Sequence, residues 1–223
     1  MLDLVYKDLV QHRKLILFYA LIGGLIGVVM MLSGSDAGAI FSAYVMVSTY
    51  GFAIRSTYDE DKSGAYLFLK SLPLSDSSIV AAKFLSVLTA AVISVVFFNA
   101  AAVFGSAIST PGALNVAAIL GKNIPAFAIV FSVAMVFAGI YLVMFFWAGF
   151  AKASTYSRAL LLVIFVVVML GSGFMERSPV VHDSMKMIEM SSWIPAISIV
   201  VSLAVYGLCC FMSILRVKAK DWS

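Results

Sequence analysis

The chain has 223 residues, of which 63% are hydrophobic and 12% charged, with a mean hydropathy of +1.07. Soluble domains are about 45–50% apolar and about 25% charged, so this composition excludes a soluble fold and indicates a membrane protein. The net charge of +4 does not indicate nucleic-acid binding, because the basic residues do not gather on one soluble face. We expect one transmembrane domain over residues 1–223.

The first predicted element is an amphipathic helix over residues 1–14, with the sequence MLDLVYKDLVQHRK. Its predicted apolar face holds Leu2, Val5, Tyr6 and Leu9. Its polar residues, placed away from that face, are Asp3, Lys7 and Asp8. This pattern predicts a helix that lies in the membrane interface, before the first span.

Six apolar segments follow that are candidates for spanning helices, which need about 20 residues. They are Leu15–Leu32, Ala37–Ile54, Phe84–Ile108, Ile124–Phe150, Ala159–Gly173 and Trp193–Leu215. The fifth is short for a span, and the fourth is long enough to tilt or kink. The first is expected to be a retained span rather than a signal peptide, since its apolar run is long and acidic residues precede it. Pro125 is expected in the first turn of the fourth, where its missing N–H costs little.

Small residues in two of these spans predict close helix packing. Gly23 and Gly27 lie four residues apart in the first span, and Ala134, Ala138 and Gly139 lie in the fourth. Trp147 and Trp193 are expected to act as anchors at the membrane interface.

The polar segment between the second and third spans predicts a short helix over Tyr58–Leu72. Thr57 and Glu60 have capping-box spacing, which favours a helix start there. An apolar stripe follows at i, i+3, i+4 and i+7, formed by Ala65, Phe68, Leu69 and Leu72. Pro73 is expected to end the helix, and Ser75 or Asp76 to cap the third span. The helix would lie along the membrane surface, either as an ordinary interfacial helix or as a lever for another protein.

Basic residues are distributed unequally between the two sides of the six predicted spans. One side holds Lys7, Arg13, Lys14, Arg55, Lys62, Lys70, Lys83, Lys152, Arg158, Arg216, Lys218 and Lys220, and the other holds Lys122, Arg177 and Lys186. The positive-inside rule therefore places both termini in the cytoplasm.

The apolar segments lack residues that would carry catalysis or ion transport. They contain no charged residue, which argues against an ion-driven pump or a voltage sensor. Asn99 is the most polar residue within a span; it could face a translocation path, but an interhelical hydrogen bond is favoured. Ser172 and His182 have no third group to orient them as a catalytic pair. The sequence holds no phosphate-binding loop, so uphill transport would need energy from another chain.

The order of these elements resembles the small six-span permease subunits of ABC-2-type transporters, a type V exporter-like architecture. The segment LKSLPLSDSSIVAAKFL resembles a stretch of the permeases that export phenol-soluble modulins. Its matching positions are Ser71, Leu72, Pro73, Leu74, Ser75, Ile79, Val80 and Lys83. Asp76 stands where a basic residue is common in that family.

The resemblance implies a non-enzymatic permease that pairs with a second, identical or different, permease subunit in the plasma membrane of a prokaryote. ATP and Mg²⁺ would be bound by a separate ABC ATPase subunit, and this chain would hold no cofactor or metal. Residues 58–72 would be the coupling helix on that ATPase. Its contact residues would be Tyr58, Asp59, Glu60, Asp61, Lys62, Tyr66, Phe68, Leu69 and Leu72.

Three functions remain open from the sequence. The preferred one is ATP-driven export of amphipathic or antimicrobial peptides, for which an aromatic and methionine-rich interior is suited. The second is an ABC-2 permease for lipids, drugs or lantibiotic immunity. The third is a membrane anchor or assembly subunit that transports nothing.

Overall fold

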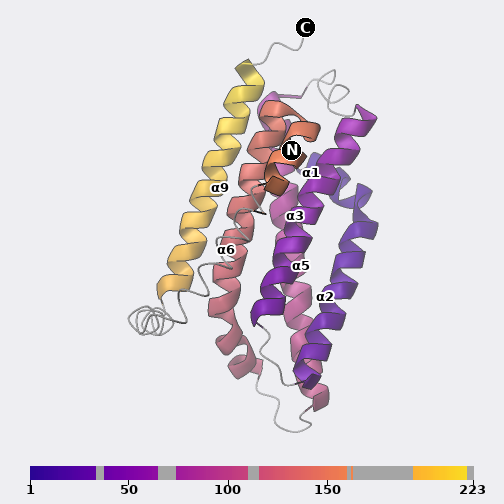
Figure 1. The fold of residues 1–223 in the computed structure, drawn as a ribbon, viewed down its shortest axis with the longest axis vertical. Coiled ribbons are helices and arrows are strands. Elements are labelled where there is room, and N and C mark those ends of the chain that lie inside the picture. The colour runs from indigo at the N-terminus through magenta and orange to yellow at the C-terminus, as the bar shows by residue number, and fades with distance from the viewer. Residues whose placement is uncertain (34–37, 65–73, 110–115, 160–161, 163–192, 220–223) are drawn as a thin grey trace.

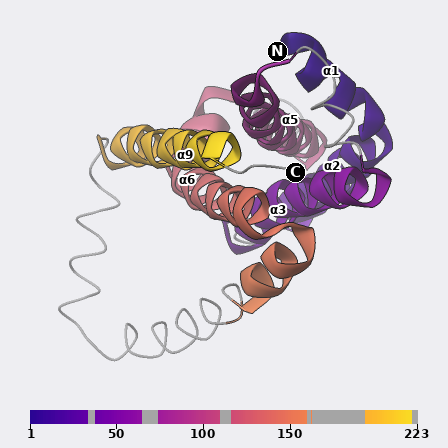
Figure 2. The same ribbon diagram turned by 90° about the horizontal axis from the view of Figure 1, so that it is seen from above.

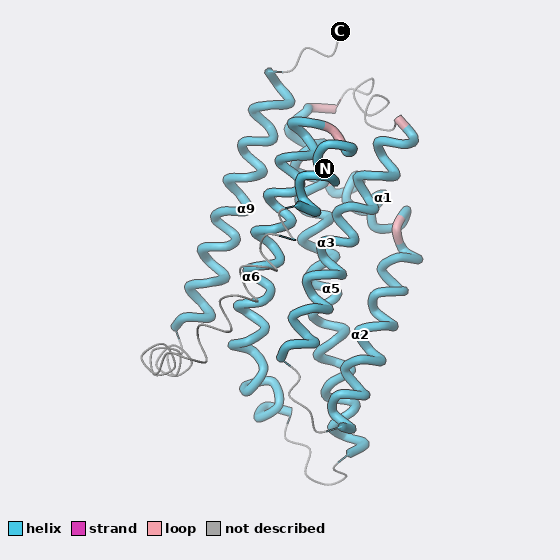
Figure 3. Tube along the Cα trace, in the orientation of Figure 1, coloured by secondary structure: helices cyan, strands magenta, loops and turns pink. Residues whose placement is uncertain are grey.

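The computed structural model describes residues 1–33, 38–64, 74–109, 116–159, 162 and 193–219, and this part of the chain is a bundle of helices without a strand (Figures 1 and 3). The helices are α1 (Leu2–Gln11), α2 (Arg13–Ser33), α3 (Gly38–Ser63), α5 (Asp76–Ser109), α6 (Val116–Ala148) and α9 (Trp193–Ala219). A further short helix covers residues 150–159.

One end of the bundle collects α1, the last turns of α3, α6 and α9, and the first turns of α5 (Figure 1). We call it the α1 end. Viewed from above, α9 lies against α6 on one side, and α2 lies on the other side against α5 (Figure 2). Helix α6 finishes at the α1 end, and α9 begins at the opposite end (Figure 1).

The apolar character of the helices agrees with a membrane protein. Within the described residues, α5, α6 and α9 are long and apolar enough to span a bilayer, and the bent pair α1–α2 would make a fourth. Helix α3 does not reach the same apolarity. The 34 residues of α5 extend over about 51 Å, which exceeds a hydrocarbon core of about 30 Å. The six-span count stays a prediction, since most of Ala159–Gly173 lies outside the described residues.

Helix α1 is separated from α2 by a bend of 67° and packs mainly against α5. On the predicted apolar face, Val5 is buried, whereas Leu2 and Tyr6 are 74% and 71% exposed. Asp8, which was predicted to lie on the polar side, is buried. The buried face includes Asp8 because a cation of α5 meets it there. The membrane-interface position of α1 stays a prediction.

Helix α3 continues nine residues beyond the predicted end of the second span, from Ile54 to Ser63. A helix start at Thr57 was therefore a wrong prediction, since residues 57–63 are the last turns of α3. Thr57 does not cap a helix; its hydroxyl hydrogen-bonds Tyr141 of α6 and the carbonyl of Ala53. Gly64 has a φ of +62°, a conformation that glycine adopts readily.

The start of α5 confirms the predicted cap. The backbone N–H of Ser78 donates to the Ser75 hydroxyl at 3.3 Å, and α5 begins at Asp76. Helix α6 begins at Val116, eight residues before the predicted start of the fourth span at Ile124. Pro125 consequently lies in the third turn of α6 rather than in its first turn.

The small residues predicted to allow close packing do so at two helix pairs. A Cβ at Gly139 would lie 3.0 Å from the ring of Tyr206 on α9, and a Cβ at Gly23 would collide with the ring of Tyr44 on α3. Tyr44 is held there by donation from its hydroxyl to the Tyr19 carbonyl at 3.0 Å and by stacking on Phe98.

We expect Gly23→Ala to destabilise the bundle by about 1–3 kcal/mol, the usual cost of overpacking. The added methyl group would displace Tyr44 from its hydrogen bond. Gly24→Ala is the matched control, since its Cβ would meet only the Ala101 methyl group at 4.0 Å. Thermal unfolding in detergent measures the difference, and equal melting temperatures for the two variants would contradict the expectation.

Candidate functional site

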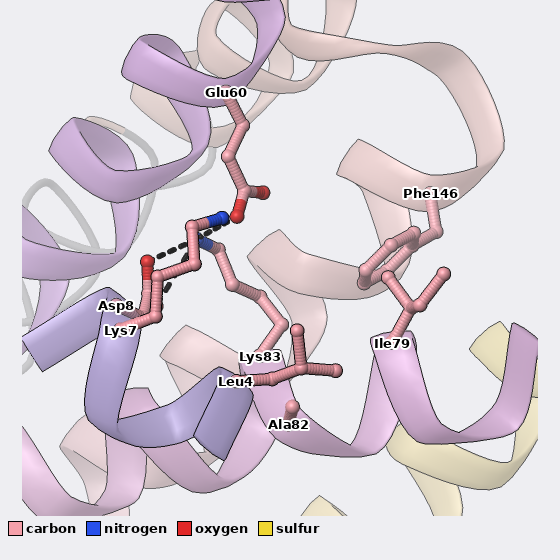
Figure 4. Close-up of a pocket in the computed structure, with 8 residues that line it drawn as sticks. All are labelled: Leu4, Lys7, Asp8, Glu60, Ile79, Ala82, Lys83 and Phe146. Carbon is pink, nitrogen blue, oxygen red and sulfur yellow. Dashed lines mark hydrogen bonds and ion pairs between the residues drawn. The ribbon is translucent and has the colours of Figure 1, made fainter. Parts of the chain in front are cut away.

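The α1 end contains a buried set of charged side chains from three helices (Figure 4). At its centre is Lys83, in the second turn of α5, whose side chain is only 4% exposed. Its Nζ lies 3.2 Å from both carboxylate oxygens of Asp8 on α1. It also lies 2.9 Å from Oε1 of Glu60 on α3. One ammonium group thus joins α1 and α3 to α5.

Asp8 has two further hydrogen-bond partners, one at its carboxylate and one at its backbone carbonyl. Ser86 lies one turn after Lys83 on α5 and donates its hydroxyl to Asp8 Oδ2 at 2.6 Å. His12 Nδ1 lies 2.9 Å from the backbone carbonyl of Asp8. Because a carbonyl oxygen only accepts, Nδ1 carries the proton in this hydrogen bond. The buried carboxylate is therefore paired and hydrogen-bonded, as a charge away from water requires.

The last turns of α3 bring one more acidic residue, Asp59, to the same place. Asp59 Oδ2 lies 3.1 Å from Arg55 Nε and 3.3 Å from His12 Nε2. Acidic residues near the C-terminus of a helix are unfavourable, since the helix dipole is negative there. The cations beside these acidic residues, Arg55 of α3 and Lys83 of α5, offset this cost. We call the group the ion cluster; its members are Asp8, His12, Arg55, Asp59, Glu60, Lys83 and Ser86.

The ion cluster leaves room for little besides its own side chains. A cavity of about 20 Å³ lies beside it, lined in part by Leu4, Ile79 and Phe146. This volume suits a single water molecule. Lys7 lines the same cavity, and its side chain extends toward the ion cluster (Figure 4). In the described part of the chain, no three histidine, cysteine or acidic residues are arranged to hold a metal ion.

Two further hydrogen bonds join helices near the α1 end. The Tyr206 hydroxyl of α9 donates to the Phe84 carbonyl of α5 at 2.7 Å. Thr57 of α3 and Tyr141 of α6 share a buried hydrogen bond. Together with the ion cluster, these bonds join α1, α3, α5, α6 and α9 at one level. Helices α3 and α5, which end at Ser63 and begin at Asp76, both take part in these contacts.

The predicted contact residues that the structure describes differ in accessibility. Glu60 is engaged by Lys83 and its side chain is only 12% exposed. Tyr58 is half-buried, with its ring 5.2 Å from that of Phe150. Asp61 and Lys62 are exposed at the end of α3. Contact of Tyr58, Asp59, Asp61 and Lys62 with another subunit stays a prediction.

The remaining predicted site residues are in two places. Tyr66, Phe68, Leu69 and Leu72 lie outside the described residues. Asn99 is half-buried in α5, and its side-chain amide donates to the Val95 carbonyl at 2.8 Å. This bond lies within one helix rather than between helices. A role for Asn99 in a translocation path stays a prediction.

The sequence-based predictions did not recognise the ion cluster as a unit. Asp8 was assigned to the polar side of its helix, and Lys83 was counted as a loop residue. The sequence contains a signal for the buried position of Lys83. Lys83 lies three residues after Val80 and four after Ile79, on the same helix face as these apolar residues. A cation on the buried face of one helix requires an acid on the buried face of a neighbour.

Comparison with known proteins gives one family. The family model described as ABC-2 family transporter protein matches residues 3–217, which is nearly the whole chain. The chain matched none of the curated proteins with which it was compared.

Proposed function

Because the chain belongs to the ABC-2 family of transporter proteins, we propose that it is the permease subunit of an ABC exporter for amphipathic or antimicrobial peptides. ATP would be hydrolysed, with Mg²⁺, on a separate ABC ATPase subunit. Two permease subunits, identical or different, would form the membrane pathway. Both termini would lie in the cytoplasm of a prokaryote, as the distribution of basic residues predicts.

The observation that carries the proposal is the bridge made by Lys83. It holds Asp8 of α1 and Glu60 of α3 through one ammonium group on α5. The segment predicted to contact the ATPase begins within the last turns of α3, and α5 begins after it at Asp76. A displacement of that segment would therefore reach α1, α3 and α5 together. Rigidly linked elements of this kind can carry a conformational change from one site to another.

The peptide substrate rests on the resemblance to exporters of phenol-soluble modulins. Large apolar side chains, including Phe97, Phe104, Phe211 and Met212, are exposed on the described helices. Such a surface suits an amphipathic cargo, and it equally suits the lipid of the bilayer. Lipid, drug or lantibiotic transport by the same architecture, and a subunit without transport activity, are therefore outcomes of the test below.

The proposal is tested by co-expressing the chain with candidate ABC ATPases and reconstituting the purified complex in proteoliposomes. We expect the ATPase to co-purify, and its ATP hydrolysis to rise when an amphipathic peptide is added. Peptide accumulation on the far side of the membrane measures transport. Stimulation by lipids or drugs alone would contradict the peptide assignment, and the absence of any co-purifying ATPase would contradict the permease assignment.

A further inference from the structure

An open apolar groove of about 580 Å³ runs between α2 and α5, on the outside of the bundle. On α2 it is lined by a stripe at i, i+4, i+7 and i+11, consisting of Leu17, Leu21, Gly24 and Val28. On α5 its wall is formed by Phe97, Ala100 and Ala101. Small residues on both helices keep the groove hollow. None of the described residues that line it is polar.

The groove has a positively charged end. Arg13 and Lys14 precede Leu17 by four and three residues, so they lie one turn above it on the same side of α2. Both side chains are exposed, and neither forms an ion pair with another described residue. The N-terminus of α2 adds the positive end of its dipole to this place.

The length of the groove argues for its occupant. Leu17 to Val29 extends over about 18 Å, whereas the hydrocarbon core of a bilayer is about 30 Å thick. The groove thus matches a chain that occupies little more than one leaflet. A helix of another subunit would cross the full core and would not need two unpaired cations at one end. An anionic headgroup with an attached acyl chain satisfies both features.

We propose that the groove between α2 and α5 binds one anionic phospholipid, with its acyl chain along Leu17–Val29 and its phosphate at Arg13 and Lys14. The site is independent of the transport function proposed above. The site would keep a lipid on the outer surface of α2. This helix begins directly after His12, a member of the ion cluster. The lipid would be retained when the chain is extracted from the membrane.

Native mass spectrometry of the full-length chain in detergent tests the site, with phosphatidylglycerol and phosphatidylcholine as probes. We expect phosphatidylglycerol to bind more tightly. Arg13→Gln together with Lys14→Gln should weaken its binding by about 30-fold, since each cation contributes about fivefold near an anionic headgroup. Ala100→Phe should abolish retention of both lipids, because the ring would fill the groove.

Matched controls separate this site from general effects. Lys152→Gln with Lys218→Gln removes two exposed cations elsewhere, and Ala204→Phe adds a ring on the exposed side of α9; neither should change lipid retention. Melting temperatures show whether each variant remains folded. Equal binding of the two lipids would overturn the proposal. The proposal would also be overturned if Ala100→Phe retained lipid normally but lost the ability to form a dimer. That result would assign the groove to a second copy of the chain.

Discussion

Lys83→Met is expected to destabilise the folded chain by about 3–5 kcal/mol, the usual effect of removing one partner from a buried ion pair. Methionine fills a similar volume but leaves the carboxylates of Asp8 and Glu60 without their shared cation. Two uncompensated charges would then remain where α1, α3 and α5 pack together. Because typical domains are stable by only about 5–15 kcal/mol, a large part of the stability would be lost. Chemical or thermal unfolding in detergent measures the effect.

The cause of this loss can be isolated with two companion variants. Lys62→Met removes an exposed lysine from the end of α3 and should change stability by less than about 0.5 kcal/mol. Asp8→Asn and Glu60→Gln, added to Lys83→Met, remove the unpaired charges and should restore much of the stability. A Lys83→Met variant as stable as the natural chain would show that the ion cluster does not hold the three helices together.

The long apolar runs made much of the helical layout predictable. Helices α2, α5 and α9 contain the predicted first, third and sixth spans, because each run of about 20 apolar residues has a stable helical form in lipid. Their polar ends were less predictable. Helix α5 begins eight residues before Phe84, where its first turns can pack against α1 rather than lipid.

The largest difference between sequence and structure lies at the end of α3. The capping-box spacing of Thr57 and Glu60 predicted a new helix there, with acidic residues in a first turn that would suit them. In the structure they occupy the last turns of α3, where the dipole disfavours them. Arg55 pairs with Asp59, and Lys83, which is distant in the sequence, pairs with Glu60. A local pattern cannot reveal such partners, because tertiary contacts override propensity.

The helix over residues 150–159 was missed for a related reason. Its sequence contains Lys152 and Arg158 and was assigned to a loop between spans. The structure begins the helix after Gly149, which has a φ of +80°. Ala153, Ser154 and Ser157 are buried and form a narrow face of small residues. Small residues give a weak hydropathy signal, so the periodicity of this face was not recognised.

Phe68→Asp or Leu69→Asp is expected to abolish coupling to the proposed ATPase while leaving the helical bundle folded. Both residues belong to the predicted apolar stripe, and both lie between Gly64 and Ser75, outside the spans. A charge introduced into an apolar docking contact would have to be desolvated without a partner, which costs several kcal/mol. Binding of the ATPase should therefore fall by more than 100-fold, roughly the effect of 3 kcal/mol.

Comparison with Lys83→Met separates docking from folding. Phe68→Asp should keep the melting temperature of the natural chain but lose the ATPase in co-purification. Lys83→Met should lower the melting temperature, because the cation it removes is buried where α1, α3 and α5 pack together. Lys62→Met is again the matched control, since Lys62 is exposed beside the same segment. Normal ATPase binding by both aspartate variants would contradict the prediction that residues 58–72 form the docking surface. A force from the ATPase would then have to enter the bundle elsewhere.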